Sequence, residues 1–317
     1  MKNQACLAFD SLSMSESILK RILKLGNFYH VIEDESGGLS LFEDNPHHLN
    51  LIRQAIRTNK PLHMILPAFP AKSPNSQKTL GHLPDYGEVL ALTRLNDLCH
   101  EIETIYPQGA YLTICSDGRV FNDLVEVSDS HVNAYTHGIR NIIDSYQLTK
   151  LDTFSLEDVC PKASDFSEMR KWLVENYASS LESLRERNQS SQEFKFLFNG
   201  IHRFLVEDQV VLHPEISKNK LRERAKGLSY SVIQRSNAWS EVLEEAFPDS
   251  VRLSIHPQAA SSKKLGIRLL DSNDIWRTPW HSVPLFDGVS YKLVSRKEAE
   301  SSGASLNYTA GHACFIC

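Results

Sequence analysis

The sequence lacks the long apolar runs that membrane proteins need. No stretch of the roughly 18 apolar residues required for a transmembrane helix occurs, and the apolar segment at the N-terminus is too short for a secretory signal. Only six of the 317 residues are cysteines, and a chain of this length buries a core without disulfides. We therefore expect a cytoplasmic protein with reduced thiols.

Motifs that identify several enzyme classes are also absent. There is no GxGxxG or Walker A motif for a nucleotide, no GxSxG for a serine hydrolase and no HExxH for zinc. The 13 histidines show no metal-ligand spacing with a third partner. The formal charge of −5 gives no general attraction to nucleic acid or to an anionic membrane. We expect no metal, no cofactor, and neither nucleic acid nor membrane as a partner.

The last four residues hold the one close cysteine pair, Cys314 and Cys317. A zinc site needs two further ligands, and no second Cys-x-x-Cys exists. A redox pair belongs at the start of a helix, and a terminal cysteine does not usually end a prenylation signal. We expect residues 306–317 to form a tail without a site.

Hydrophobic periodicity predicts one α/β domain over residues 1–317, with a helical N-terminal portion at 1–60 and a helical insertion at 164–247. Helices are predicted at 14–25, 46–59, 86–105, 129–146, 165–187, 191–206 and 218–246, and strands at 62–66, 110–115, 251–255, 265–270 and 289–294. The first strand–helix–strand unit implies parallel pairing, whereas 251–255 and 265–270 are close enough in sequence for an antiparallel hairpin. We expect a Rossmann-like mixed sheet with helices on both faces.

A proline-rich loop at 67–84 directly follows the first predicted strand. Ligands in open α/β sheets bind beyond the carboxyl ends of the strands, and long ordered loops are usually functional. Lys72, Ser73 and Lys78 in this loop are suited to hold a phosphate, and a solvated lysine-bearing loop is the alternative. Asp85, with a glutamate three residues later, predicts a capping box for the next helix.

Charged residues directly follow the second predicted strand. A charge at the end of a buried strand costs folding free energy unless it forms an ion pair or contacts a ligand. Asp117 and Arg119 therefore form either a simple ion pair or a functional pair, in which Asp117 transfers protons and Arg119 holds an anion. Ser116 beside them adds a hydroxyl for the same ligand.

Two histidines stand at places where a ligand is expected. His256 follows the strand 251–255, and Arg252 and Ser254 share its face. The pKa of a histidine lies near neutrality, which suits a general acid or base; local hydrogen bonding at the strand end is the alternative. His281 follows a tryptophan in a proline-bounded turn, where it either faces a ligand or packs in a structural corner.

Taken together, these segments resemble the pyoverdine/dityrosine biosynthesis proteins, whose bacterial members are isonitrile synthases. The resemblance runs from about residue 15 to 305, and six segments in one order are far more specific than any single one. The six segments are Leu66–Asn75, Leu83–Glu88, Ser116–Asp123, Gln234–Ser240, Arg252–Pro257 and Thr278–His281.

The resemblance implies an enzyme that joins the amino group of L-tyrosine or L-tryptophan to ribulose 5-phosphate. The C2 atom of the sugar becomes the isonitrile carbon, through an imine and acid/base-assisted elimination. The resemblance also implies that no metal or redox cofactor is needed, and that a partner oxygenase acts on the product.

Side-chain chemistry then assigns hypothetical roles to the candidate residues. Proton transfer needs groups such as Asp117, His256 and His281, with Lys72 as a further catalytic or phosphate-binding candidate. The phosphate is expected to contact Lys78, Arg119, Arg235 and Arg252, with the hydroxyls of Ser73, Ser116 and Ser254. The aromatic side chain of the amino acid is expected among Phe69, Phe121 and Trp239.

Three other functions stay open from the residues. A phosphosugar lyase or isomerase would use Lys72 as a Schiff base, although such a lysine normally occupies an apolar place rather than a polar loop. A phosphosugar-binding protein would keep the site without turnover. A relative of the yeast type would release a formyl amino acid instead of an isonitrile.

Overall fold

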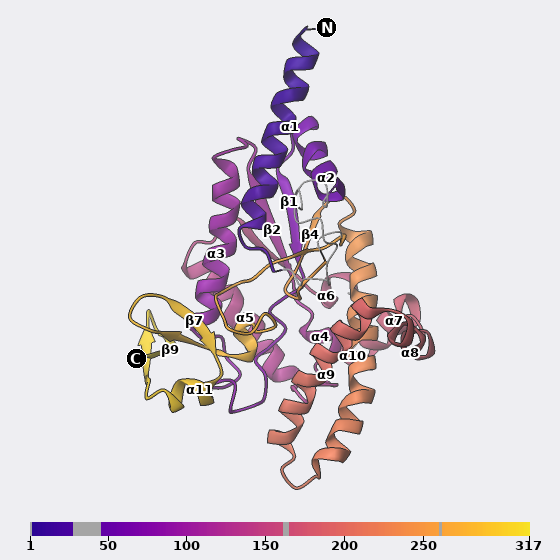
Figure 1. Ribbon diagram of the computed structural model, residues 1–317, viewed down its shortest axis with the longest axis vertical. Helices are drawn as coiled ribbons and strands as arrows, with labels where there is room; N and C mark the ends of the chain where they lie inside the picture. The colour runs from indigo at the N-terminus through magenta and orange to yellow at the C-terminus, as the bar shows by residue number, and fades with distance from the viewer. Residues whose placement is uncertain (1, 28–45, 161–164, 260–261) are drawn as a thin grey trace, which may run out of the picture.

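The computed structural model describes residues 2–27, 46–160, 165–259 and 262–317, with side chains from residue 13 onwards. A five-stranded sheet forms its centre, and all neighbouring strands run parallel (Figure 1). The strand order is β3-β2-β1-β4-β5, with β1 Leu62–Leu66, β2 Ala110–Cys115, β3 Leu151–Phe154, β4 Val251–Ser254 and β5 Leu265–Gly266. The order changes direction between β1 and β4, which is where open α/β sheets bind their ligands.

The central strands are mainly apolar because both faces of the sheet are covered. In β1, the side chains of Met64 and Leu66 point to one face and that of Ile65 to the other, and all three are buried. Met64 and Leu66 belong to the largest core cluster, whereas Ile65 packs in a second cluster with Trp239. Continuous apolar strands of this kind are typical of parallel sheets.

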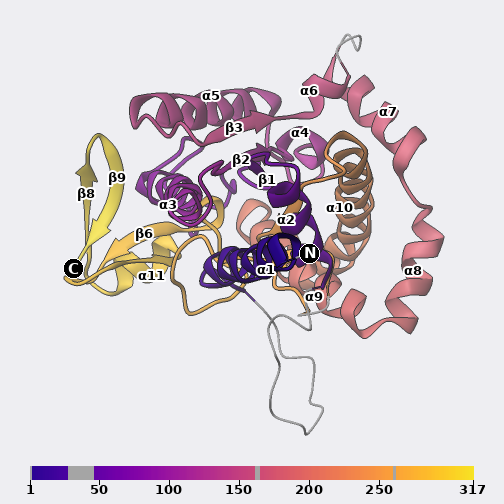
Figure 2. The ribbon, with the colours of Figure 1, turned by 90° about the horizontal axis from the view of Figure 1, so that it is seen from above.

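Helices lie on both faces of the sheet, as the sequence predicts (Figure 2). Among the helices of ten or more described residues, four supply the core cluster of Met64, and two supply that of Ile65. The first group is α1 Lys2–Leu23, α2 Pro46–Arg57, α3 Tyr86–Glu103 and α5 Asp129–Ser145, and the second is α7 Phe166–Tyr177 and α10 Lys218–Ala246. The Asp85 side chain accepts from the Gly87 amide and Glu88 accepts from the Asp85 amide, so the predicted capping box of α3 is confirmed.

The segment 164–247 is largely helical where it is described, although one predicted helix is interrupted. The helix predicted at 165–187 breaks at Ala178, whose backbone is extended (φ −85°, ψ 134°), and a new helix follows. The helices after the break are α8 Leu181–Ser190, α9 Gln192–Leu212 and α10. α9 and α10 pack side by side and extend beyond the sheet at the bottom of Figure 1. Among the described residues, no helix is both long and apolar enough to cross a membrane.

The antiparallel hairpin expected at 251–255 and 265–270 is wrong, because β4 and β5 pair in parallel. The backbone of Asn27 holds both ends of the connection between them: its carbonyl accepts from the Gln258 amide at 3.1 Å, and its amide donates to the Gly266 carbonyl at 2.8 Å. A Cβ on Gly266 would lie 2.1 Å from the Asn27 oxygen, so this approach requires glycine. The segment after α1 therefore contacts both ends of this connection.

A second, four-stranded sheet is built from the C-terminal residues. Its order is β7-β6-β9-β8, with β6 Val283–Phe286, β7 Tyr291–Val294, β8 Ser305–Thr309 and β9 His312–Ile316. The residues 306–317, expected to be a tail, thus form most of β8 and all of β9. The mixed pairing lies in this sheet, because β6 and β9 are parallel and the other pairs antiparallel. The short helices are α4 Gly118–Phe121, α6 Leu156–Val159, η1 Pro279–His281 and α11 Arg296–Ser301.

Candidate active site

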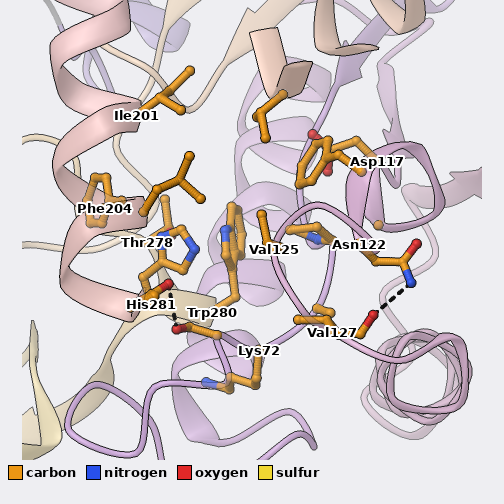
Figure 3. Close-up of a pocket in the computed structure, with 18 of the residues that line it drawn as sticks. Lys72, Asp117, Asn122, Val125, Val127, Ile201, Phe204, Thr278, Trp280 and His281 are labelled. Atoms are coloured by element: carbon orange, nitrogen blue, oxygen red, sulfur yellow. Dashed lines mark hydrogen bonds between the residues drawn. The ribbon is translucent and has the colours of Figure 1, made fainter. Parts of the chain in front are cut away.

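A cavity of about 130 Å³ lies at the carboxyl ends of β1, β2 and β4 (Figure 3). Its wall combines the loop after β1, the region of α4, the end of β4, helices α9 and α10, and the segment that leads into β6. Figure 3 shows Phe204 and His281 on one side of this space and Asp117 on the other. Its apolar side chains include Phe121, Val125, Ile201, Phe204, Leu205 and Trp280. We call this space the apolar compartment.

A second cavity of about 310 Å³ adjoins the first, and we call it the polar compartment. The polar and charged residues of its wall include Arg187, Ser240, Ser254, Gln258, Lys263 and Lys264. The two compartments share the wall residues Asp117, Ile201, Ser236, Ile255, His256 and Trp276. Two of the predicted proton carriers, Asp117 and His256, therefore lie where the apolar and polar compartments meet.

Close backbone contacts hold the loop after β1 against α4. A Cβ on Gly118 would lie 2.1 Å from the Pro70 carbonyl oxygen, so only glycine allows this approach. The Ser116 hydroxyl donates to the Phe69 carbonyl at 3.1 Å, and the Phe69 ring packs on Trp280 with 5.1 Å between the ring centroids. Ser116 and Phe69, both predicted to contact substrate, thus support the wall of the cavity from behind.

Asp117 is the carboxyl group that both compartments share. It precedes α4 without capping it, and its buried Oδ1 atom has no hydrogen-bond partner among the residues that the structure describes. Burial raises the pKa of Asp117 from 3.8 to about 7. Arg119 does not pair with Asp117, because its guanidinium binds Glu157 at 3.0 Å and Asp129 at 3.3 Å. An unpaired carboxyl group that changes charge near neutral pH is suited to accept and return protons.

His256 and His281 both line the apolar compartment as neutral imidazoles at pH 7. Burial, with a contribution from the charge of Lys264, lowers the pKa of His256 to about 4. Burial also lowers the pKa of His281 to about 3, and Lys78 is the largest charge that adds to this shift. Each ring therefore offers a nitrogen that can accept a hydrogen bond, although its lowered pKa makes it a weak base. In the described part of the chain, no group of three or more His, Cys, Asp or Glu residues could hold a metal ion.

Lys72 lies at the wall of the apolar compartment, but its ammonium group is bound by buried carboxylates of the protein core. It lies 2.7 Å from Asp85 and 2.9 Å from Glu88, and it donates to the Pro279 carbonyl at 2.9 Å. Burial lowers the pKa of Lys72, yet the two carboxylates outweigh this effect and raise it above the ordinary value. A lysine held in its charged form by two carboxylates is poorly suited to form a Schiff base.

The other polar residues of the loop bind helix α9. Ser73 lines the apolar compartment, and its hydroxyl donates to Asp208 at 3.1 Å. The ammonium of Lys78 lies 2.7 Å from Asp208 and 2.9 Å from Glu207. These contacts fix the loop to α9, and two carboxylates neutralise the charge of Lys78 that was expected to hold a phosphate.

The three predicted phosphate-binding arginines are not brought together by the fold. Arg119 packs its guanidinium on the Phe166 ring, in addition to its ion pairs. Arg235 lies 2.6 Å from Asp123, and Arg252 lies 3.1 Å from Glu244. None of the three arginines lines either compartment.

The predicted aromatic residues take different places. Phe121 lines the apolar compartment. Trp239 touches the polar compartment but is buried in the core, where it stacks on Phe154 and donates to the Cys115 carbonyl at 3.4 Å. The predicted Ser254 lines the polar compartment, and its hydroxyl accepts from the His256 amide at 3.2 Å.

Several residues of the two walls were missed from the sequence. Ile201 and Phe204 lie on α9, whose periodicity predicted a helix without showing which face meets the site. Trp276 was missed although it precedes the Thr278–His281 segment by two positions. Lys264 was interpreted as part of a hairpin connection, and a basic pair directly before a strand was the signal that could have identified it.

The family resemblance inferred from the sequence is confirmed by comparison with known proteins. The family model described as pyoverdine/dityrosine biosynthesis protein matches residues 52–306. An L-tryptophan isonitrile synthase of Fischerella ambigua is 46% identical over 265 residues, which are 84% of this chain and 83% of the relative. An L-tyrosine isonitrile synthase of Pseudomonas aeruginosa is 42% identical over 254 residues, or 79% of this chain and 77% of the relative.

The fold agrees with this relationship. The crystal structure of the PvcA protein from Pseudomonas aeruginosa superposes with a TM-score of 0.88 at 37% sequence identity. The match covers 96% of this chain and 99% of that chain, so the two folds agree over nearly their whole length. The chain is therefore an enzyme that belongs to the pyoverdine/dityrosine biosynthesis protein family.

Proposed function

We propose that this enzyme is an isonitrile synthase that acts on an aromatic L-amino acid, with ribulose 5-phosphate as the carbon donor. The observation that carries the proposal is the carboxyl group of Asp117, which has no ion-pair partner among the described residues and lies at the junction of the apolar and polar compartments. Two chemically different substrates that must react with each other fit such a divided site. The relatives named for L-tryptophan and L-tyrosine support the choice of an aromatic amino acid.

The apolar compartment suits the side chain of the amino acid. Phe121, Phe204, Trp276 and Trp280 supply aromatic surface, and Ile201 supplies aliphatic surface. Ligand sites of this kind bury most of a small ligand among apolar groups and orient it with a few polar ones. Burial of an indole or phenol ring here would leave its amino group among the polar wall residues Asp117, His256 and His281.

The first chemical step would join the amine nitrogen to the C2 ketone of the sugar. The nitrogen loses protons as the carbon–nitrogen bond forms, and the C2 oxygen gains them to leave as water. Asp117, with a pKa of about 7, is available in both protonation states for these transfers. The neutral rings of His256 and His281 can accept hydrogen bonds and orient the reacting groups, because their lowered pKa values make them weak bases at pH 7.

The later steps must free C2 from the rest of the sugar. An isonitrile carbon is bonded to nitrogen alone, so both carbon–carbon bonds of C2 have to break. The isonitrile carbon keeps one electron pair, so one fragment must leave without the bonding electrons, as a carbonyl compound after its hydroxyl group loses a proton. The other fragment leaves with its bonding electrons and gains a proton. A buried, partly apolar site strengthens each charge interaction with the developing intermediates, because water that would screen it is excluded.

We also propose a cytoplasmic setting and a following oxygenase. All the described cysteines are free thiols, which agrees with a reducing compartment. They are Cys99, Cys115, Cys160, Cys314 and Cys317. The oxygenase is the partner that the family resemblance implies for the isonitrile product.

The decisive experiment uses ribulose 5-phosphate labelled with carbon-13 at C2. The purified enzyme is incubated with this sugar and with L-tryptophan, L-tyrosine or L-leucine, and the products are examined by mass spectrometry and infrared spectroscopy. A labelled isonitrile from one of the aromatic amino acids alone is the expected result. Binding of the sugar phosphate without any new product would support a phosphosugar-binding protein, and a formyl amino acid would support the alternative product.

A further inference from the structure

The polar compartment contains three cations without a carboxylate partner. Arg187, Lys263 and Lys264 line its wall, and none forms an ion pair within the described residues. The lysines and arginines first expected to hold a phosphate are, by contrast, all matched with carboxylates. A cation that lines a cavity without a counter-ion is available to an anionic ligand.

Lys264 has the most defined position of the three. Its Nζ atom donates to the Ser240 hydroxyl oxygen at 2.9 Å, and Arg252 donates to the same oxygen at 2.5 Å. Because that oxygen accepts from two charged donors, its own proton must point elsewhere, and Ser240 lines the cavity. The guanidinium of Arg252 is balanced by Glu244 at 3.1 Å, which leaves Lys264 as the unbalanced charge.

The charges around Lys264 keep the compartment positive at neutral pH. Burial and then the charge of Arg252 lower the pKa of Lys264 to about 8, while Glu244, Glu241 and Glu193 act in the opposite direction. Lys264 is therefore mainly protonated at pH 7. Glu193 and Asp117 line the compartment as well, so its wall holds three cations and two carboxyl groups.

We infer that the polar compartment binds the phosphate group of the sugar substrate, with Lys264 and the Ser240 hydroxyl as its principal contacts and Lys263 and Arg187 around them. This inference rests on the proposed function, which supplies a phosphorylated sugar. A phosphate ester carries close to two negative charges at pH 7 and three strong acceptor oxygens, which match this set of donors. The carbonyl end of the sugar would then extend toward Asp117 and His256, which both compartments share.

Chemical footprinting of Lys264 tests the inference without measuring turnover. The whole enzyme is treated briefly with acetic anhydride, and acetylation of each lysine is quantified by tandem mass spectrometry. We expect ribulose 5-phosphate to reduce acetylation of Lys264 by about tenfold at saturation, and inorganic phosphate to protect it at higher concentration. Unphosphorylated ribulose and L-tryptophan should not protect. Equal protection by ribulose, or protection by the amino acid, would overturn the phosphate assignment.

Substitutions provide a second readout. Lys264→Met should weaken binding of ribulose 5-phosphate by about 10- to 100-fold, and Lys264→Arg should restore most of it. The matched control Lys171→Met removes a lysine whose side chain is 73% exposed on α7, and it should bind the sugar as the unchanged enzyme does. The KM for the aromatic amino acid should stay unchanged in all three variants. Normal sugar affinity in folded Lys264→Met would refute the inference.

The two proposals fail in different ways. If the enzyme forms the isonitrile but ribulose 5-phosphate leaves Lys264 unprotected, the proposed function stands and the phosphate site is wrong. If ribulose 5-phosphate and phosphate protect Lys264 but no isonitrile forms from any aromatic amino acid, the anion site stands and the proposed reaction is wrong.

Discussion

Asp85 holds Lys72 with one carboxylate oxygen and caps helix α3 with the other. Its Oδ2 atom lies 2.7 Å from the Lys72 ammonium, and its Oδ1 atom accepts from the Gly87 amide at 2.8 Å. Glu88 contacts the same ammonium and accepts from Tyr135 at 3.0 Å. The loop that forms one wall of the site is thus anchored to the start of a core helix by a fully buried charge cluster.

Removal of the lysine from this cluster is expected to destabilise the fold. Lys72→Met would leave Asp85 and Glu88 buried without a counter-ion, which costs about 3–5 kcal/mol in the free energy of unfolding. Urea denaturation, followed by circular dichroism, measures this loss, with Lys171→Met as a control that should change stability little. A Lys72→Met enzyme of unchanged stability but without activity would instead assign Lys72 a direct catalytic role.

Asp117 is expected to set the pH dependence of the reaction on its acid side. A general base must be unprotonated, so kcat should rise as pH increases through about 7, where Asp117 loses its proton. Asp117→Asn should lower kcat by about 10²- to 10⁴-fold and remove this inflection. Rate profiles between pH 5 and 9 for both proteins provide the measurement. An inflection that persists in the variant would transfer the role to another group.

The same substitution is expected to stabilise the folded protein at alkaline pH. The folded-state pKa of Asp117 is raised above its ordinary 3.8, so the folded form binds the proton more tightly and loses stability as pH rises toward about 7. Asp117→Asn removes this cost, which amounts to at most about 4 kcal/mol at about 1.4 kcal/mol per pKa unit. Denaturant unfolding at pH 8 should show the gain, and at pH 4 the two proteins should be nearly equal. A loss of stability at pH 8 would contradict the unpaired state of this carboxyl group.

Gly200 is expected to control the width of both compartments through Trp276. A Cβ at position 200 would lie 2.6 Å from the Trp276 ring, so Gly200→Ala must push this ring toward the space that both compartments share. We expect the KM for the aromatic amino acid to rise about tenfold, which corresponds to about 1.4 kcal/mol of lost binding free energy. Gly227→Ala on α10 is the matched control, because a Cβ at position 227 would meet nothing within 4 Å, and this variant should bind normally. Equal KM values in both variants would show that Trp276 does not bound the substrate.

Local sequence patterns were enough to predict much of the scaffold. The strands 62–66 and 110–115, the helix 218–246 and the capping box at Asp85 were identified at the residues where they occur. Each depends on contacts within a few positions along the chain: a short apolar run, a 3.6-residue period, or a cap and its partner three residues away. The six family segments also located the loops that surround the site.

Tertiary structure alone decided which polar residues face the site. Arg119 follows a strand and Arg235 lies in a family segment. Glu157 nevertheless neutralises Arg119, Asp123 neutralises Arg235, and neither arginine lines the apolar or the polar compartment. Lys264, taken for part of a hairpin, lines the polar compartment because Asn27 holds the connection before β5. Ion pairs and parallel strand partners form between residues far apart in sequence, and no local period records them. The sequence determined the family and many of the helices and strands, whereas long-range charge pairing and packing selected the groups left free to meet a substrate.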